Sequence, residues 1–422
     1  MKQRKTLTDE RSSRAVMICC WLIYTVAYLT RNTYPASIVH LTGAELMTQS
    51  AAGFISTCYF ITYGAGHLIN GFLADRISPV FMLITGICGT AAANIAMIFT
   101  LPNVPLSASV WCLNGWFESM LWAPIVALLS GMIAPSLRRR AMEAVSVTRP
   151  TGVILAYLIT ALCSYCGTGI GIPYVIAAVC AAVTCVLFSV ISKRAYSAPD
   201  TVDVTAERAE KTGSEKAPVM KALAASGALI FALPAVFHGM LKDGVNTWVP
   251  SLLRDSFRTT DAFSTMLAIA IPIAGVVGIL LANFLLGRKR LGGNHSVIGI
   301  ILMLAAAVPA AVLIRAEAIP LPAGVACLCL VSLLMESFCH VFSVMMPTEF
   351  AKYGRASTVS GIFNSLIYVG SAVSTYTFGA VAERIGWSGT AVIWLSLSLI
   401  SAAVLAFAVK PWSRFLDPAK KL

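Results

Sequence analysis

The chain has 422 residues, of which 58% are hydrophobic and only 12% are charged, and its formal net charge is +12. This balance excludes an ordinary water-soluble domain, in which about a quarter of the residues are charged. Apolar runs of about twenty residues recur along the whole length, and each is long enough to cross a bilayer. We therefore predict an all-α membrane protein embedded in the lipid bilayer.

The hydropathy pattern predicts twelve transmembrane helices in two groups of six. The spans expected in the first group are 15–39, 50–73, 80–101, 106–134, 142–165 and 169–192. Those expected in the second group are 223–252, 262–286, 295–316, 319–346, 357–381 and 388–409. Residues 193–221 are polar and charged, which is typical of a mobile linker. The sequence thus predicts two six-helix domains, 1–192 and 222–422, joined by a cytoplasmic linker at 193–221.

The lysines and arginines indicate the orientation of these helices. Of the 31, four fall in expected outer loops (Arg254, Arg258, Arg315 and Arg384), three lie within spans, and the other 24 fall on the side of the N terminus. Cytoplasmic loops carry such an excess of positive charge. We therefore expect a multi-pass protein of the inner membrane with both termini in the cytoplasm. The membrane accounts for the positive charge, so we infer no nucleic-acid partner.

One charge lies near the middle of the first expected span, between Trp21 and Leu41. An arginine there, Arg31, costs several kcal/mol unless it is compensated. Tyr24, Tyr28 and Arg31 stand at i, i+4 and i+7, so two phenol groups and a guanidinium share one helix face. Such a face suits a carboxylate or phosphate. The alternative is a structural ion pair with an acidic residue of another helix.

A weak similarity between the two groups of helices supports two related halves. Helix 1 carries Arg31 and helix 7 carries Lys242, each in a span with a proline, while helices 4 and 10 carry Glu118 and Glu336. If a pseudo-two-fold axis along the membrane normal relates the halves, the two cations would face each other across a central cavity. Asp243 follows Lys242, and adjacent residues of an α-helix point to different faces.

No constellation of residues indicates an enzyme, a cofactor or a metal site. The chain has no G-x-x-x-x-G-K-[ST] loop for nucleotide phosphates. Glu336 and His340 stand at i and i+4, a spacing that allows a hydrogen bond, but no third ligand accompanies them. A packing pair or a proton relay is the better interpretation.

Several stretches resemble known families. Gly71–Pro79, GFLADRISP, resembles the loop after helix 2 in the major facilitator superfamily, with Gly71, Asp75 and Arg76 at its motif positions. Four segments resemble the organophosphate:phosphate antiporter family: YTVAYLTRN in helix 1, GWFESMLWAP in helix 4, MLKDGVNTWVPSLL in helix 7 and the stretch from helix 11 to RIGWSG. The resemblance covers nearly the whole chain.

This resemblance implies the major facilitator fold and a set of substrate-binding residues. Arg31 and Lys242 stand at the positions of two phosphate-clamping cations, and Lys242 replaces the usual arginine, which keeps the charge but loses the bidentate fork. The other implied binding positions are Tyr24, Tyr28, Trp248, Arg149 (where phosphate-transporting members commonly have histidine) and His67 (where some have lysine). Arg149 either adds positive charge for the anion or pairs with Glu118. Glu118 replaces the family's glutamine and is either a counter-charge or a proton shuttle.

The resemblance further implies a transporter that exchanges a small organophosphate or sugar phosphate for inorganic phosphate by alternating access. Two alternatives stay open, a proton-coupled organic-anion symporter and a sugar-phosphate sensor that does not transport. We expect a monomer whose partners are an anionic small molecule and the lipid bilayer.

Overall fold

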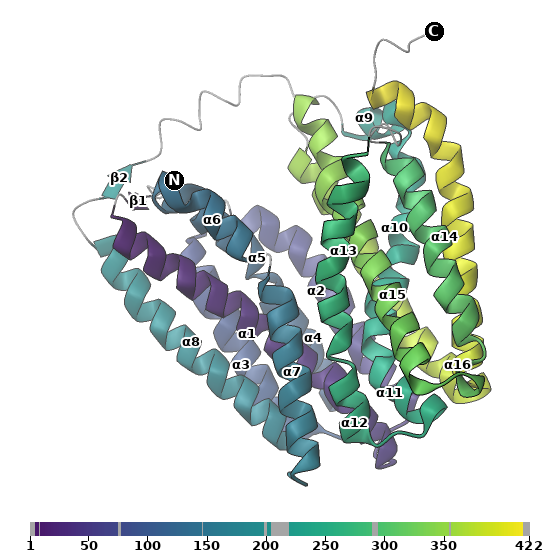
Figure 1. The fold of residues 1–422 in the computed structure, drawn as a ribbon. Helices are drawn as coiled ribbons and strands as arrows, with labels where there is room; N and C mark the ends of the chain where they lie inside the picture. The colour runs from purple at the N-terminus through teal and green to yellow at the C-terminus, as the bar shows by residue number, and fades with distance from the viewer. Residues whose placement is uncertain are drawn as a thin grey trace. The chain divides into compact units, whose positions relative to one another are not determined.

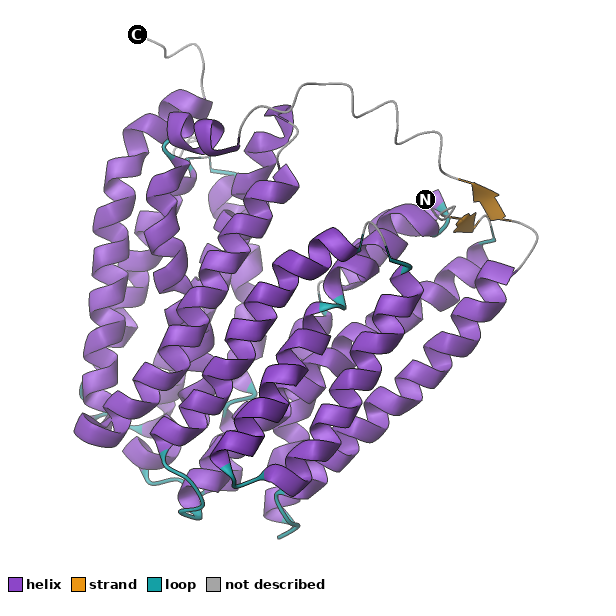
Figure 2. Ribbon diagram, turned by 180° about the vertical axis from the view of Figure 1, so that it is seen from behind, coloured by secondary structure: helices purple, strands orange, loops and turns teal. Residues whose placement is uncertain are grey.

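The computed structural model describes residues 5–7, 9–74, 77–145, 147–197, 201–203, 219–288, 294–353 and 356–416. Nearly all of these residues are helical, and the remainder includes one short antiparallel ribbon (Figure 1, Figure 2). Most of the predicted linker, at 198–200 and 204–218, lies outside the described residues. The all-α prediction is thus confirmed for the described part of the chain, apart from the ribbon.

The chain forms two compact units. The first comprises Met1–Leu41 and Ile61–Ser214, and the second comprises Thr42–Phe60 and Glu215–Leu422. Residues 42–60 therefore group with the second unit although they lie early in the chain. They include the start of α2, so the first half of this helix belongs to the second unit and its second half belongs to the first unit.

The first unit is built mainly from the helices of the N-terminal half. These are α1 (Glu10–Gly43), α2 (Gln49–Leu73), α3 (Pro79–Thr100), α4 (Val104–Ser119), α5 (Trp122–Ala127), the π-helix η1 (Leu128–Met132), α6 (Pro135–Val145), α7 (Thr148–Tyr165) and α8 (Gly171–Ser197). In Figure 1, α3 and α8 run side by side. Helix α3 also packs against α4, and α7 packs against α8. Its largest apolar cluster contains residues of α1, α5, η1, α6 and α8.

A two-stranded ribbon was not predicted. Strand β1 (Lys5–Leu7) pairs antiparallel with β2 (Thr201–Asp203), so the start of the chain meets the segment after α8 (Figure 2). Leu7 is 2% exposed and joins the apolar cluster of the first unit. Burial of Leu7 in this cluster and the pairing with β2 both hold the strand in place.

The second unit contains the helices of the C-terminal half. These are α9 (Val219–Ser226), the 3₁₀-helix η3 (Ala228–Phe231), α10 (Ala232–Gly239), the π-helix η4 (Met240–Gly244), α11 (Val245–Phe257), α12 (Asp261–Leu267), α13 (Ala270–Leu286), α14 (His295–Leu313), the 3₁₀-helix η6 (Ala316–Ala318), α15 (Leu321–Cys339), the π-helix η7 (His340–Met345), the 3₁₀-helix η8 (Met346–Tyr353) and α16 (Ala356–Leu416). Helix α16 packs against α10 and α14, and α13 packs against α15.

Within the described residues, ten helical stretches are long and apolar enough to cross a membrane. One of them, Thr358–Leu416, is 59 residues long, which is long enough for two crossings of about twenty residues each. It is broken at Gly386, whose φ of 78° and ψ of 175° leave the helical region and are open to glycine without a steric cost. Each of the twelve predicted spans overlaps one of these stretches or α2, and the last two lie on either side of the break in α16.

Helix starts follow ordinary capping chemistry. Asn103 and Asn294 accept hydrogen bonds from the first backbone N–H groups of α4 and α14, and Thr260 does the same for α12. Asp9 accepts from the backbone of Arg11 and Ser12. These hydrogen bonds, chiefly those from Ser12, hold the pKa of Asp9 below its usual range.

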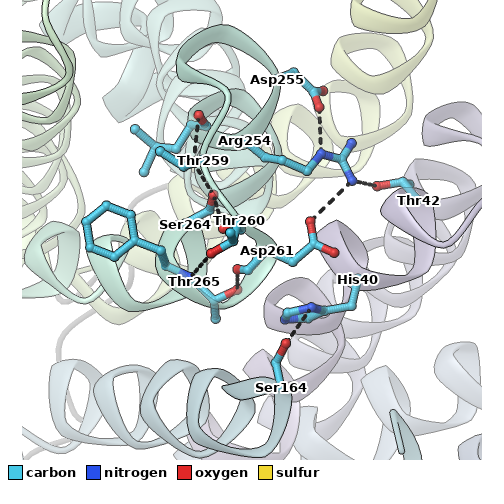
Figure 3. A network of polar contacts seen from close by, with 12 residues as sticks. His40, Thr42, Ser164, Arg254, Asp255, Thr259, Thr260, Asp261, Ser264 and Thr265 are labelled. Atoms are coloured by element: carbon cyan, nitrogen blue, oxygen red, sulfur yellow. Dashed lines mark hydrogen bonds and ion pairs between the residues drawn. The ribbon is translucent and has the colours of Figure 1, made fainter. Parts of the chain in front are cut away.

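A polar network ties residues 42–50 to the rest of the second unit (Figure 3). Asp255 accepts from Arg254 Nε at 2.6 Å, from Gln49 Nε2 at 2.9 Å and from the indole of Trp387 at 2.9 Å. Figure 3 shows that the Arg254 guanidinium contacts both Asp255 and Thr42. Its Nη1 donates to the Thr42 hydroxyl at 3.2 Å. Hydrogen bonds from charged groups are about twice as strong as neutral ones, so this network fixes the turn between α1 and α2 on the second unit.

Two acidic side chains extend this network. Glu383 of α16 accepts from the backbone N–H and the hydroxyl of Ser50 at 2.9 and 2.6 Å, so it caps the start of α2. Asp261 lies 3.7 Å from the guanidinium of Arg254. In the first unit, His40 Nδ1 and the Ser164 hydroxyl lie 3.3 Å apart, which joins the last turn of α1 to α7 (Figure 3).

Candidate functional site

The predicted anion-binding face of helix 1 is a partly exposed stripe. Tyr24, Tyr28 and Arg31 are each partly accessible on α1, whereas the residues between them are mostly buried. A stripe facing lipid tails would be apolar, because an exposed guanidinium is costly there. Two phenols and a guanidinium therefore indicate a surface that faces water or a polar ligand.

Arg31 lies against aromatic rings from two helices. Its Cζ is 4.7 Å from the ring centroid of Tyr63 on α2 and 5.7 Å from that of Tyr28. Such cation–π contacts stabilise a guanidinium through the face of the ring. The ring of Tyr63 also meets that of His67, at 4.5 Å and nearly perpendicular. The structure thus brings together three of the predicted residues, Tyr28, Arg31 and His67, through Tyr63.

Tyr63 was missed by the sequence reasoning. The signal was available, since Tyr63 and His67 stand at i and i+4 on one helix face. A second missed residue is Trp122, which belongs to the helix 4 motif GWFESMLWAP. Its ring stacks on Tyr24 at 5.0 Å, and Tyr24 in turn meets Tyr28 edge to face at 5.1 Å. Aromatic packing of this kind fixes the orientation of both phenols.

Arg149 lies in the first turn of α7 and is partly accessible. Three residues later, Gly152 approaches the backbone of α1 so closely that a side chain there would collide with Thr25 and Tyr28. Residues three apart lie on the same side of a helix. Arg149 therefore belongs to the part of α7 that packs beside the Tyr24–Tyr28 turn of α1.

Glu118 is the acidic end of a buried polar ladder. Its carboxylate Oε1 accepts from Asn114 Nδ2 at 3.2 Å and lies 3.5 Å from the hydroxyl of Thr30 on α1. Asn114 accepts from the hydroxyl of Thr90 at 2.8 Å, and Thr90 accepts on its carbonyl from Asn94 at 3.0 Å. Glu118 is only 4% exposed. These polar residues on α1, α3 and α4 supply hydrogen-bond partners for a buried acid.

Lys242 and Asp243 are neighbours in the chain that form an ion pair. They pair, with Lys242 Nζ 3.4 Å from Asp243 Oδ1, although adjacent side chains of a regular α-helix diverge. The reason is the π-helical turn η4, which contains both residues and widens the helix locally. The hydroxyl of Ser371 on α16 donates to the other oxygen of Asp243 at 2.7 Å. Both side chains are 9% exposed.

The remaining predicted residues of the second unit pack between helices. Trp248 is fully buried and its indole N–H donates to the carbonyl of Thr375 at 3.0 Å. His340 Nε2 lies 3.0 Å from Asn283 Oδ1 on α13, so its partner there is on another helix. A side chain at Gly275 of α13 would come within 2.9 Å of Glu336.

The predicted loop motif is described only in part. Gly71 lies in the last turn of α2, and a side chain there would meet open space. Asp75 and Arg76 lie outside the described residues.

The sequence is similar to those of known membrane proteins. A probable hexose phosphate transport protein from Chlamydia muridarum is 23% identical over 414 residues, covering 92% of this chain and 89% of that protein. The glycerol-3-phosphate transporter of Bacillus subtilis is 24% identical and covers 93% and 91%. The membrane sensor protein UhpC of Salmonella typhimurium is 28% identical, but over only 28% and 26% of the two chains.

The fold has solved counterparts. A bacterial homolog of the human lysosomal transporter Spinster, in an inward-facing and occupied conformation, superposes with a TM-score of 0.70 at 12% identity and covers 98% of both chains. A family model described as Major Facilitator Superfamily matches residues 20–375, which is most of the sequence. The relatives and the fold are those of transporters and not of enzymes. The chain is therefore a multi-pass membrane protein that belongs to the Major Facilitator Superfamily and, within it, is similar to the organophosphate transporters.

Proposed function

We propose that this protein exchanges a small phosphate ester for inorganic phosphate across the inner membrane by alternating access. The observation that carries the proposal is the α1 stripe, where Arg31 lies 4.7 Å from the ring of Tyr63 and two further tyrosines share its helix face. A guanidinium presents a planar fork that matches two phosphate oxygens, and phenol hydroxyls supply further donors.

The chain's own residues divide the work as follows. Arg31 binds the phosphoryl group, and Tyr24 and Tyr28 donate hydrogen bonds to it. Arg149, in the turn of α7 beside them, adds positive charge and selects more highly charged anions. Lys242 is the second phosphate-binding cation that the family resemblance implies. His67 holds the Tyr63 ring on which Arg31 rests. Because charge on the protein attracts any small dianion, inorganic phosphate serves on the return journey.

The likeness to transporters of hexose phosphate and glycerol 3-phosphate, each over about nine tenths of both chains, supports a phosphate ester as cargo. The proposal includes a monomer with both termini in the cytoplasm, and the positive charge of the expected inner loops supports that orientation.

A competition experiment tests the substrate class. Purified protein in liposomes loaded with phosphate takes up labelled phosphate, and glucose 6-phosphate, glycerol 3-phosphate and 3-phosphoglycerate are added outside. We expect at least one phosphate ester to inhibit uptake, while glucose and glycerol at the same concentration do not. Equal inhibition by the esters and by their uncharged parents would contradict the proposal, since a guanidinium site discriminates through charge.

A further inference from the structure

The pair formed by Lys242 and Asp243 is the feature of the second unit that the proposed function does not explain. Lys242 Nζ lies 3.4 Å from Asp243 Oδ1, and Asp243 Oδ2 accepts from Ser371 at 2.7 Å. The carboxylate is thus held from two sides, by an ammonium on its own helix and by a hydroxyl on α16. A transporter that needs only positive charge here would have no use for a carboxylate beside it.

The surrounding backbone is built to create this arrangement. Gly239 of α10 lies against the backbone carbonyl of Ile367, and a side chain at Gly244 would come within 2.6 Å of the Ser374 hydroxyl. Small residues at these two positions let the helix approach α16 closely. The π-turn between them rotates Asp243 toward Ser371 and Lys242 at once, and π-turns are frequent at functional sites.

The consequence for an anion follows from Coulomb's law. The interaction energy of two charges falls with the inverse of their distance. An anion that contacts Lys242 lies about twice as far from Asp243 as from the ammonium, so the carboxylate cancels about half of the attraction. With both side chains 9% exposed, water screens this repulsion little.

We propose that Asp243, oriented by Ser371, is a positioning residue that weakens the hold of Lys242 on the transported anion and so speeds its release. The inference rests on the proposed function, because it presumes that Lys242 meets an anion. Asp243 also holds the ammonium in one place, which replaces the orientation that an arginine fork would supply. A cation that is held in this way favours fast exchange over high affinity, because a ligand that binds more tightly dissociates more slowly.

The experiment compares variants in phosphate-loaded liposomes with labelled inorganic phosphate as the probe. Asp243→Asn keeps the shape and removes the charge. We expect its KM for phosphate to fall about tenfold and its maximal exchange rate to fall with it. Ser371→Ala, which removes one hydrogen-bond donor to the carboxylate, shifts both values in the same direction by less. Ser374→Ala is the matched control, because that hydroxyl donates to the backbone carbonyl of Ser371 and not to Asp243; we expect no change.

The outcomes separate the inference from the proposed function. An Asp243→Asn variant with unchanged KM and rate, in a protein whose wild type exchanges phosphate, overturns the inference alone. A wild type that exchanges no phosphate overturns the proposed function and the inference with it. A purely structural role predicts a lower rate with an unchanged KM and no rescue by Asp243→Glu, whereas the inference predicts that Asp243→Glu restores the wild-type KM.

A thermal readout tests the pair without transport. Lys242→Gln, Asp243→Asn and the double variant are compared by their melting temperatures in detergent. Each single change leaves one buried charge without its partner, so we expect the double variant to melt above at least one single variant. Strictly additive losses in the double variant would overturn the assignment of Asp243 as the residue that holds Lys242.

Discussion

Replacing Arg31 is the sharpest perturbation that the site offers. A hydrogen bond from a charged group is worth about 1.5–3 kcal/mol, so the two bonds of a guanidinium fork contribute about 3–6 kcal/mol. At about 1.4 kcal/mol for each factor of ten, Arg31→Ala should weaken phosphate binding about 100- to 10,000-fold. Arg31→Lys keeps the charge and loses one bond of the fork, so we expect a loss of about 10- to 100-fold.

The assay is the concentration dependence of labelled phosphate exchange in liposomes. Arg139→Ala is the matched control, because the Arg139 side chain is 91% exposed and pairs only at the surface with Glu143, at 2.9 Å. That variant should exchange phosphate like the wild type. If Arg31→Ala retained the wild-type KM while Arg139→Ala behaved as expected, the reasoning about the α1 stripe would be refuted.

Three further predictions concern the surroundings of the site. Glu118→Gln keeps the acceptor for Asn114, so we expect the melting temperature and the pH dependence of exchange to be unchanged. Glu118→Ala removes that acceptor and should cost about 1–3 kcal/mol of stability. A pH profile that the glutamine alters would instead identify Glu118 as a coupling group. Tyr63→Phe should exchange phosphate normally, whereas Tyr63→Leu should bind phosphate several-fold more weakly, because only the leucine removes the cation–π contact with Arg31. Equal effects of the two variants would contradict a role for this contact. Asp255→Ala removes the acceptor of three donors and should lower the melting temperature by a few degrees in a thermal unfolding scan; an unchanged value would mean that the network adds no stability.

Much of the fold could be predicted because a bilayer imposes simple rules. A helix must be about twenty apolar residues long to cross it, so hydropathy alone placed each span on a helical stretch, although the ends of several spans differ from those of the stretch by five to seven residues. The ribbon of β1 and β2 could not be predicted this way. Its pairing joins residues 5–7 to residues 201–203, and three-residue segments carry no period that distinguishes them from loop.

The site was predictable where it depends on one helix and unpredictable where it depends on two. The Tyr24, Tyr28 and Arg31 face of α1 follows from spacing alone. The contact of Glu118 with the hydroxyl of Thr30, at 3.5 Å, does not follow from spacing, because Thr30 lies on another helix, α1. The pairing of Lys242 with Asp243 does not follow from spacing either, because it depends on a π-helical turn that the sequence pattern does not indicate.

The central claim is that this protein exchanges phosphate for a phosphate ester. The most direct measurement is uptake of labelled inorganic phosphate by liposomes that contain the purified protein, with phosphate inside or with empty interiors. Exchange predicts rapid uptake only where phosphate is present inside, because an anion must occupy the site on the return journey. Uptake that is equal in loaded and empty liposomes, or that follows an imposed proton gradient, would contradict the account.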